Sequence, residues 1–269
     1  MTQRHATITT LGSSDAFNSG GRGNSCFFVV DSVGAYALDF GPTAPLIARR
    51  LGVDLNQLDV VYLTHLHGDH LGGLPSLLID MIFECRRERP LTIAGPEGTE
   101  RVVLALCELL YPGTVASHLS FELTFIEWPR RGTLKVSGRR VTSWPAQHDL
   151  HVMPTSIRIE PLSGLGPCLA FSGDTGWCDS LVEVARGADA LICECSFETY
   201  VFDGHLSLEE IKNHRQELEV NRLILTHFST ASRDAALKSL DALQIEVADD
   251  GVTFKVSSRD APNTLEETQ

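Results

Sequence analysis

The fold is decided by one stretch of sequence, Thr64-His65-Leu66-His67-Gly68-Asp69-His70-Leu71-Gly72-Gly73, which holds three imidazoles and a carboxylate within six residues. The stretch directly follows the apolar run Val60-Val61-Tyr62-Leu63, which is typical of a buried strand that ends in a loop. Neutral imidazole and carboxylate are the ligands expected for catalytic zinc, manganese or iron. Because these four side chains are more than one ion usually accepts from a short loop, the stretch predicts a site for two metal ions.

Three further candidate ligands lie just beyond other predicted strands: His148 after residues 140–147, Asp174 after residues 168–172 and His227 after residues 222–225. The run Arg222-Leu-Ile-Leu-Thr-His227 repeats the pattern Val60-Val-Tyr-Leu-Thr-His65 of the first half. This repetition predicts two related halves whose strand ends face each other across one site. We therefore expect residues 1–256 to form a single domain of two pseudo-symmetric halves, followed by a polar tail at residues 257–269.

Strand and helix patterns alternate through both halves, which favours the α/β class. Alternating or short apolar runs predict further strands at residues 6–12, 26–30, 35–40, 91–94, 121–128, 132–136, 155–160 and 190–195. Helical periodicity predicts helices at residues 43–51, 74–88, 97–110, 179–186 and 207–218. The last of these helices begins with a capping box of Ser207 and Glu210.

The composition of the 269-residue chain argues against several classes of partner. A net charge of −13 disfavours bulk attraction to nucleic acid or to an anionic membrane, since neither polyanion is drawn to an acidic surface. The sequence has neither a long apolar run nor an apolar segment near Met1, so we expect no membrane span and a cytoplasmic location. The seven cysteines are an odd number without zinc-ribbon spacing, and we expect them to be reduced and mostly buried.

Four motifs of the chain, taken in order, resemble those of the metallo-β-lactamase superfamily of binuclear metallohydrolases: His65-x-His67-x-Asp69-His70, His148, Ser172-Gly173-Asp174-Thr175 and Thr226-His227. The resemblance covers nearly the whole chain. It implies an α/β fold of the four-layer αββα type, in which two mixed sheets are flanked by helices and the metals lie at one edge of the sheets. It also implies two divalent metal ions, with zinc as the first choice and manganese or iron as alternatives. In the implied ligand set, the first ion is held by His65, His67 and His148, the second by Asp69, His70 and His227, and Asp174 bridges them.

Within the superfamily, the chain is similar to the phosphodiesterase branch, which includes ribonuclease Z and the cyclic phosphodiesterase of phosphonate catabolism. Asp174 stands where hydrolytic β-lactamases place cysteine, Glu194 and His205 resemble the Glu and His pair of the branch, and residues 11–25 resemble its amino-terminal signature. The similarity implies that a metal-bridging hydroxide attacks phosphorus, that Asp69 orients this hydroxide, and that His205 acts as general acid with Glu194 orienting its ring. Arg22, the basic residue of the signature, is expected to contact the phosphate.

The expected function is hydrolysis of a small phosphodiester, such as a cyclic nucleotide or a cyclic sugar phosphate, without a stable nucleic-acid complex or a membrane partner. A homodimer is one option for the assembly. Only 25 residues separate His148 from Asp174, which leaves no room for the long arm with which ribonuclease Z grips tRNA. Three alternatives stay open: a lactonase or thioesterase, a ribonuclease Z-like enzyme acting on unstructured RNA, and a non-catalytic metal-dependent sensor. Cys193 and Cys195, which flank Glu194, are expected to be packing residues.

Overall fold

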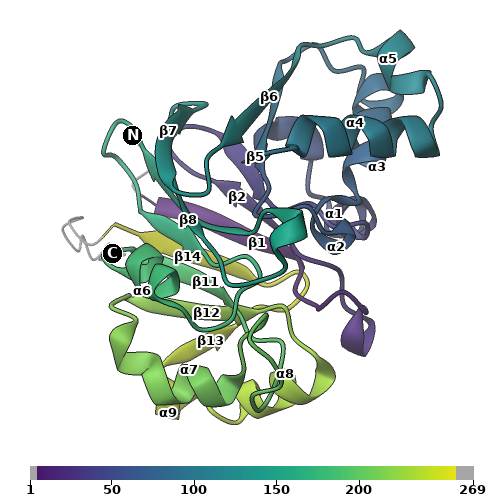
Figure 1. Cartoon of the computed structure of the whole chain (residues 1–269). Helices are drawn as coiled ribbons and strands as arrows, with labels where there is room; N and C mark the ends of the chain where they lie inside the picture. The colour runs from purple at the N-terminus through teal and green to yellow at the C-terminus, as the bar shows by residue number, and fades with distance from the viewer. Residues whose placement is uncertain (1–4, 259–269) are drawn as a thin grey trace, which may run out of the picture.

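Two mixed β-sheets face each other at the centre of the molecule, and helices cover their outer faces (Figure 1). The computed structural model describes residues 5–258. Within this range, the first seven-stranded sheet has the order β14-β1-β2-β3-β4-β5-β6, and the second has the order β13-β12-β11-β10-β9-β8-β7. This arrangement confirms the predicted four-layer αββα sandwich.

The two sheets share one pattern of pairing. Counted from β14 in the first sheet and from β7 in the second, three antiparallel pairings are followed by three parallel ones. The strands of the first sheet are β1 (His5–Gly12), β2 (Cys26–Val30), β3 (Ala35–Leu38), β4 (Leu58–Tyr62), β5 (Leu91–Pro96), β6 (Leu123–Trp128) and β14 (Thr253–Ser257). Those of the second are β7 (Gly132–Val136), β8 (Arg139–Pro145), β9 (Thr155–Pro161), β10 (Leu169–Phe171), β11 (Ala190–Glu194), β12 (Arg222–Thr226) and β13 (Ile245–Val247).

The helices form two groups, one on each sheet (Figure 1). The helices packed on the first sheet are α1 (Ala44–Leu51), α2 (Gly68–Leu71), α3 (Leu74–Ile79), α4 (Thr99–Leu110) and α5 (Thr114–His118). The helices packed on the second sheet are α6 (Asp179–Ala185), α7 (Leu208–His214), α8 (Thr230–Leu237) and α9 (Leu240–Leu243). Each group buries its apolar side chains against the outer face of its own sheet.

A third apolar cluster fills the space between the sheets, with side chains such as Ile8 and Val60 meeting Ile157 and Ile224. Because successive residues of a strand point to opposite faces, the same strands supply both this central core and the outer cores. Strands β3, β4, β10, β11 and β12 belong to the parallel parts of the two sheets. The carboxyl ends of parallel strands meet at one edge of a sheet, so the loops that follow these strands are brought together.

A buried ion pair ties the two sheets to each other. Arg139 is the first residue of β8, and its Nε and Nη2 donate to the Asp31 carboxylate, which follows β2, at 2.8 and 2.7 Å. The guanidinium also lies over the Tyr36 ring, 4.6 Å from its centroid. Both charged side chains are almost fully buried, so the pair is satisfied within the protein and not by solvent.

The predicted helix at residues 74–88 ends too late. In the structure, α3 ends at Ile79 and continues as a π-helical turn only to Glu84. The reason lies in Arg87, whose buried guanidinium donates to the carbonyl oxygens of Asn56 and Leu58, both at 2.6 Å, and so draws the chain out of the helix.

Other boundaries also differ from the predictions. Helix α4 starts at Thr99, because Pro96 is the last residue of β5 and Gly98 adopts a φ of 91°. Helix α7 has the predicted capping box of Ser207 and Glu210 but ends at His214. The sequence did not predict α5, α8, α9, β13 or β14, which are short or only weakly periodic.

Two predictions concern the ends and the division of the chain. The predicted polar tail at residues 257–269 begins too early, because Ser257 still pairs with His5 in the sheet; residues 259–269 lie outside the described part of the chain, as do residues 1–4. The single domain of two pseudo-symmetric halves and the cytoplasmic location stay predictions. Among residues 5–258, no helix combines the length and the apolar character needed to cross a membrane.

Candidate metal centre

The predicted ligands come together where strands of both sheets end. His65, His67, Asp69 and His70 lie in the loop after β4 and in α2, and the remaining ligands follow β8, β10 and β12. Thr155, the first residue of β9, joins the second sheet to the loop after β4. Its N–H and its hydroxyl both donate to the Thr64 carbonyl oxygen, at 3.0 and 2.8 Å. The structure therefore gathers all seven side chains that the sequence proposed as metal ligands.

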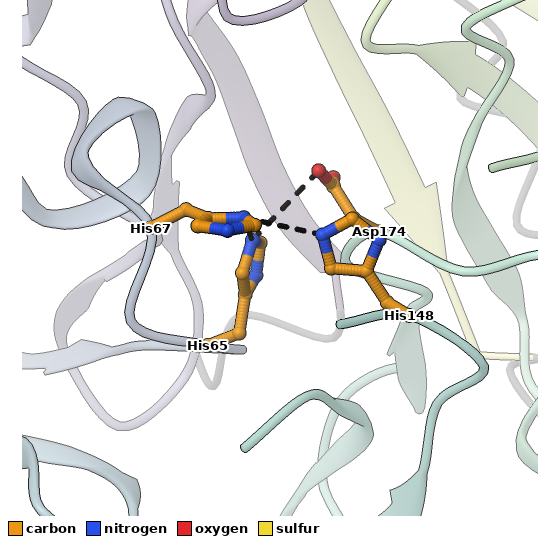
Figure 2. Close-up of side chains that lie close together, drawn as sticks. All are labelled: His65, His67, His148 and Asp174. Atoms are coloured by element: carbon orange, nitrogen blue, oxygen red, sulfur yellow. Dashed lines mark hydrogen bonds and ion pairs between the residues drawn. The ribbon is translucent and has the colours of Figure 1, made fainter. Parts of the chain in front are cut away.

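The first group of ligand atoms comes from His65, His67, His148 and Asp174, which lie within 4.8 Å of one another. Figure 2 shows their side chains converging from opposite sides of the site. His67 presents Nδ1, which lies 3.2 Å from His65 Nε2 and 3.1 Å from His148 Nε2. Asp174 Oδ2 lies 3.7 Å from His65 Nε2. Three imidazole nitrogens and a carboxylate oxygen facing one point are the donor set of a zinc-type site.

The second group comes from Asp69, His70, Asp174 and His227, again within 4.8 Å. His70 Nε2 lies 3.3 Å from an oxygen of Asp69 and 3.3 Å from Asp174 Oδ1. His227 Nε2 lies 3.4 Å from Asp69 Oδ2 and 3.5 Å from Asp174 Oδ2. Asp174 belongs to both groups, so its carboxylate is in the position of a bridge between two ions.

Two buried polar atoms support a cation at this point. His70 Nε2 and Asp174 Oδ1 lie 3.3 Å from each other but make no well-aligned hydrogen bond to any described residue, although both are shielded from solvent. A buried polar atom without a partner is costly, and a divalent ion would provide the missing interaction. Burial would raise the pKa of Asp174, but the imidazoles of His227 and His70 hold it well below its usual range. The site is thus built around a carboxylate that favours positive charge beside it.

The histidines are fixed by contacts on their outer nitrogens. His70 Nδ1 lies 2.7 Å from the buried carboxylate of Asp39, and His65 Nδ1 lies 3.0 Å from the Thr64 hydroxyl. The other two contacts are those of His148 Nδ1 with the Gly204 carbonyl oxygen at 2.8 Å and of His227 Nδ1 with the Ser196 hydroxyl at 3.0 Å. Such contacts set the ring orientation and leave the inner nitrogen free to bind a metal.

Asp39 and Ser196 are functional residues that the sequence reasoning missed. Asp39 directly follows strand β3 and also accepts from the Thr64 N–H at 2.8 Å. The sequence predicted a strand at residues 35–40, which placed Asp39 inside the strand, whereas β3 ends at Leu38 and leaves Asp39 just past its end. Ser196 carried no signal in the sequence, because a single serine after a strand is common.

Glu194 and His205 form the predicted pair beside the ligands. His205 Nδ1 donates to Glu194 Oε1 at 2.9 Å, and its ring stacks on His227 with centroids 5.6 Å apart. Burial lowers the pKa of His205, but the Glu194 carboxylate outweighs this effect and raises the pKa to about 9. His205 is therefore protonated at neutral pH in the metal-free protein.

A cavity of about 470 Å³ opens over these residues. Its floor includes His67, Asp69, Asp174, His205 and His227, and its walls include Phe17, Phe197 and Phe202. The Phe17 side chain is 87% exposed and that of Phe202 is 48% exposed, so two aromatic faces are available to a ligand. The volume and the lining residues of this cavity are typical of a site for a small molecule.

The structure places Arg22 outside this cavity. Its Nε donates to the Ser19 carbonyl oxygen at 3.1 Å and its Nη2 to the Phe228 carbonyl oxygen at 3.0 Å, and it lines a separate surface depression with Arg233. The guanidinium braces the loop that carries Phe17 against the residue after His227. Arg22 is thus not brought together with the other predicted site residues.

Cys193 and Cys195 are both buried in the core between the second sheet and its helices, as expected of packing residues. Burial raises the pKa of each thiol, so neither is a reactive thiolate at neutral pH.

Comparisons with known proteins agree with this geometry. Residues 6–247 match the model of the family described as anti-Pycsar protein Apyc1. The ribonuclease Z of Methanothermobacter thermautotrophicus is 28% identical over an alignment that covers 94% of this chain and 98% of that protein. The metallo-β-lactamase fold protein YhfI from Bacillus subtilis aligns with a TM-score of 0.74 and 20% identity, over 94% of this chain and all of that one. A diphosphatase of the PhnP family aligns with a TM-score of 0.70 and 20% identity, over 93% of this chain and 97% of that one.

The predicted resemblance to the metallo-β-lactamase superfamily, and to its ribonuclease Z and cyclic phosphodiesterase-like branch, is confirmed. The match to the family model extends over most of the chain, including all the ligand-bearing loops. The chain is therefore a metal-dependent hydrolase with the metallo-β-lactamase fold, and it belongs to the family of the anti-Pycsar protein Apyc1.

Proposed function

We propose that the protein is a two-metal phosphodiesterase that hydrolyses a small phosphodiester, with cyclic nucleotides and cyclic sugar phosphates as the preferred class. The observation that carries this proposal is the His205–Glu194 pair, which lies beside the two ligand groups and lines the same cavity. Cleavage of a phosphodiester expels an alkoxide, and a protonated imidazole at this position can supply the proton that this leaving group needs.

The proposed roles divide among the chain's own residues. His65, His67 and His148 would hold one ion, Asp69, His70 and His227 would hold the other, and Asp174, which belongs to both groups, would be shared between them. Two divalent ions, of which zinc suits the nitrogen-rich ligand set best, would lower the pKa of a water and balance the charge of the phosphoryl group.

Asp69 and His205 act on the substrate side. Asp69 lines the cavity floor and orients the attacking oxygen. His205 keeps Nδ1 on Glu194, so its Nε2 is the nitrogen that donates to the leaving oxygen. Glu194 is 1% exposed and holds the ring of His205 in this orientation.

The shape of the cavity favours a small substrate with a planar ring. The cavity is only about 470 Å³, and none of its lining residues in the described chain is Lys or Arg, which a long polyanion would need for affinity. Phe17, Phe197 and Phe202 instead offer apolar faces, and a base stacked on an aromatic side chain gains about 1–3 kcal/mol. The net charge of −13 also disfavours an extended nucleic acid.

The comparisons support phosphoryl-ester chemistry without choosing the substrate. One relative is named a ribonuclease and one structural neighbour a diphosphatase, and both names describe cleavage at phosphorus. Ribonuclease activity on unstructured RNA is the second candidate, because the ribonuclease Z relative aligns over nearly its whole length.

The test is a substrate panel assayed with zinc-loaded and with chelator-treated protein. The panel contains bis-para-nitrophenyl phosphate, 2′,3′- and 3′,5′-cyclic nucleotides, unstructured RNA, a lactone and a thioester. The proposal predicts metal-dependent turnover of the cyclic nucleotides with the highest kcat/KM. Turnover restricted to the lactone or the thioester would contradict it, RNA as the best substrate would favour the second candidate, and metal binding without any turnover would indicate a sensor.

A further inference from the structure

We propose that Ser196 is a positioning residue that holds the metal ligand His227 and the acid His205 on one hydrogen-bonded unit. The inference rests on the proposed metal centre but not on the identity of the substrate. Ser196 lies two residues beyond the end of β11, at the bottom of the cavity, and is 5% exposed. Its hydroxyl lies within hydrogen-bond distance of Glu194, His205 and His227.

The hydroxyl has one proton to donate, which fixes the direction of each bond. Its shortest contact is with Glu194 Oε2, at 2.6 Å, and a carboxylate oxygen can only accept. The Ser196 O–H therefore donates to Glu194, and its oxygen is left as an acceptor. His227 Nδ1 lies 3.0 Å from that oxygen and must carry the proton that it donates.

This bond decides which nitrogen of His227 is available to a metal. With Nδ1 donating to Ser196, Nε2 is the nitrogen that faces the carboxylates of Asp69 and Asp174, at 3.4 and 3.5 Å, and a metal ion would take the place of any proton on Nε2 there. His227 itself is buried, and its φ of 56° holds the backbone in the left-handed region. The Ser196 hydroxyl therefore holds a proton on Nδ1 and leaves Nε2 as the nitrogen that faces the metal site.

His205, the proposed general acid, contacts the same two residues, Glu194 and Ser196. His205 Nδ1 donates to Glu194 Oε1 at 2.9 Å and lies 3.2 Å from the Ser196 oxygen, while its ring is nearly parallel to that of His227, at 13°. Asp39, the partner of His70, has its side-chain hydrogen bonds to Thr64 and His70 and none to the acid among the described residues. Ser196 thus connects the metal side of the site to the proton-donating side.

Removal of the hydroxyl has a specific consequence. Glu194 keeps three backbone donors, the N–H groups of Thr175, Ser196 and Leu206, and also keeps His205. Within residues 5–258, the Ser196 hydroxyl is the one hydrogen-bond partner of His227 Nδ1. Removal of the hydroxyl therefore mainly removes the hydrogen bond to the metal ligand His227. Loss of such a contact to a metal ligand weakens metal binding by about 10- to 100-fold.

The test compares Ser196→Thr with Ser196→Val, which have the same shape and differ in the hydroxyl. Ser143→Ala is the control, because it removes another buried hydroxyl bond, to the Pro129 carbonyl oxygen. Metal-free protein is titrated with Zn²⁺ by calorimetry against a competing chelator, and the proton on His227 Nδ1 is followed by ¹⁵N NMR of the imidazole.

We expect Ser196→Thr and the control to bind Zn²⁺ like the wild type and to keep the proton of His227 on Nδ1. We expect Ser196→Val to bind one Zn²⁺ about 10- to 100-fold more weakly, to bind the other normally, and to lose part of the proton on His227 Nδ1. Equal Zn²⁺ affinities and equal occupancy of the Nδ1 proton in Ser196→Val and Ser196→Thr would overturn the proposal. Both measurements are made without substrate, so a wrong assignment of the phosphodiesterase activity would leave this result unaffected.

Discussion

Glu194 links the residues that carry the proposed chemistry. Its Oε1 accepts from His205 Nδ1 and from the Thr175 N–H, next to Asp174, at 2.9 and 2.6 Å. Its Oε2 accepts from the Ser196 hydroxyl. A buried carboxylate surrounded by donors is held in one orientation, so its charge acts on His205 at a fixed distance.

Replacement of Glu194 by Gln should move the pH dependence of catalysis. The carboxylate raises the pKa of His205 to about 9, against the effect of burial, and the acid works only while it is protonated. Without the negative charge this pKa falls, so the alkaline limb of kcat should shift to lower pH by about one unit or more. A pH–rate profile of Glu194→Gln measures the shift. The exposed Glu198→Gln is the control, and an unshifted alkaline limb in Glu194→Gln would contradict the role of Glu194.

Replacement of His205 by Ala should depend on the leaving group. An alkoxide of a nucleotide needs a proton, and a general acid contributes about 10²- to 10⁴-fold to the rate. Para-nitrophenolate leaves without help, so kcat for bis-para-nitrophenyl phosphate should fall far less than kcat for a cyclic nucleotide. Parallel assays of both substrates give the comparison; equal losses would show that His205 does not act as the acid.

At the scale of elements, the strand-end rule explains why the metal ligands could be predicted from the sequence. Asp174 and His227 follow β10 and β12 of the parallel part of the second sheet, whose carboxyl ends meet at one edge. His148 follows β8, which is antiparallel to both of its neighbours, and it was found from its place at a strand end together with the resemblance to the superfamily. The partners of the ligands depend on contacts between distant segments. Ser196 is 31 residues from His227, and Arg22 is 206 residues from the Phe228 carbonyl oxygen that it binds. Such contacts leave no periodic signal in the sequence.

The loop between β1 and β2 is an element with a defined task. The Asp15 carboxylate accepts from the N–H groups of Phe17 and Ser19, at 3.1 and 3.2 Å, and Arg22 fixes the far end of the loop. These bonds hold the backbone while the Phe17 side chain stays exposed at the cavity. A rigidly held, exposed phenylalanine is suited to contact a substrate.

Phe17→Ala should therefore weaken binding of a substrate that carries a base. Loss of one stacking contact of about 1–3 kcal/mol corresponds to a KM roughly 5- to 150-fold higher. The KM of a cyclic sugar phosphate without a base should change little. Steady-state kinetics on both substrates provide the test, with Phe83→Ala as the control because Phe83 is half exposed but lies away from the cavity. An unchanged KM for the cyclic nucleotide would remove Phe17 from the substrate site.

At the scale of the whole molecule, the two sheets must keep their relative position, because the metal ligands are divided between them. His65, His67, Asp69 and His70 follow a strand of the first sheet, and His148, Asp174 and His227 follow strands of the second. The division of the chain into two related halves stays a prediction. Small shifts between the sheets would separate the ligand groups.

The Arg139–Asp31 pair should contribute strongly to this arrangement. Arg139→Met leaves the Asp31 carboxylate buried without its partner, and breaking a buried pair in this way costs about 3–5 kcal/mol. The double variant with Asp31→Leu should recover part of this loss, because no unpaired charge remains. Urea unfolding monitored by circular dichroism measures both variants; a loss below about 1 kcal/mol in Arg139→Met would show that the pair is not important.

We propose that the seven side chains hold two ions and that the protein uses them to hydrolyse a small phosphodiester. The most direct measurement is the rate of cyclic-nucleotide hydrolysis as Zn²⁺ is added stepwise to the metal-free protein. We predict that the rate rises until two equivalents are bound per chain, and that Asp174→Ala, which removes the bridging carboxylate, stays inactive at every ratio. A rate that reaches its plateau at one equivalent, or no hydrolysis with both ions bound, would contradict this account.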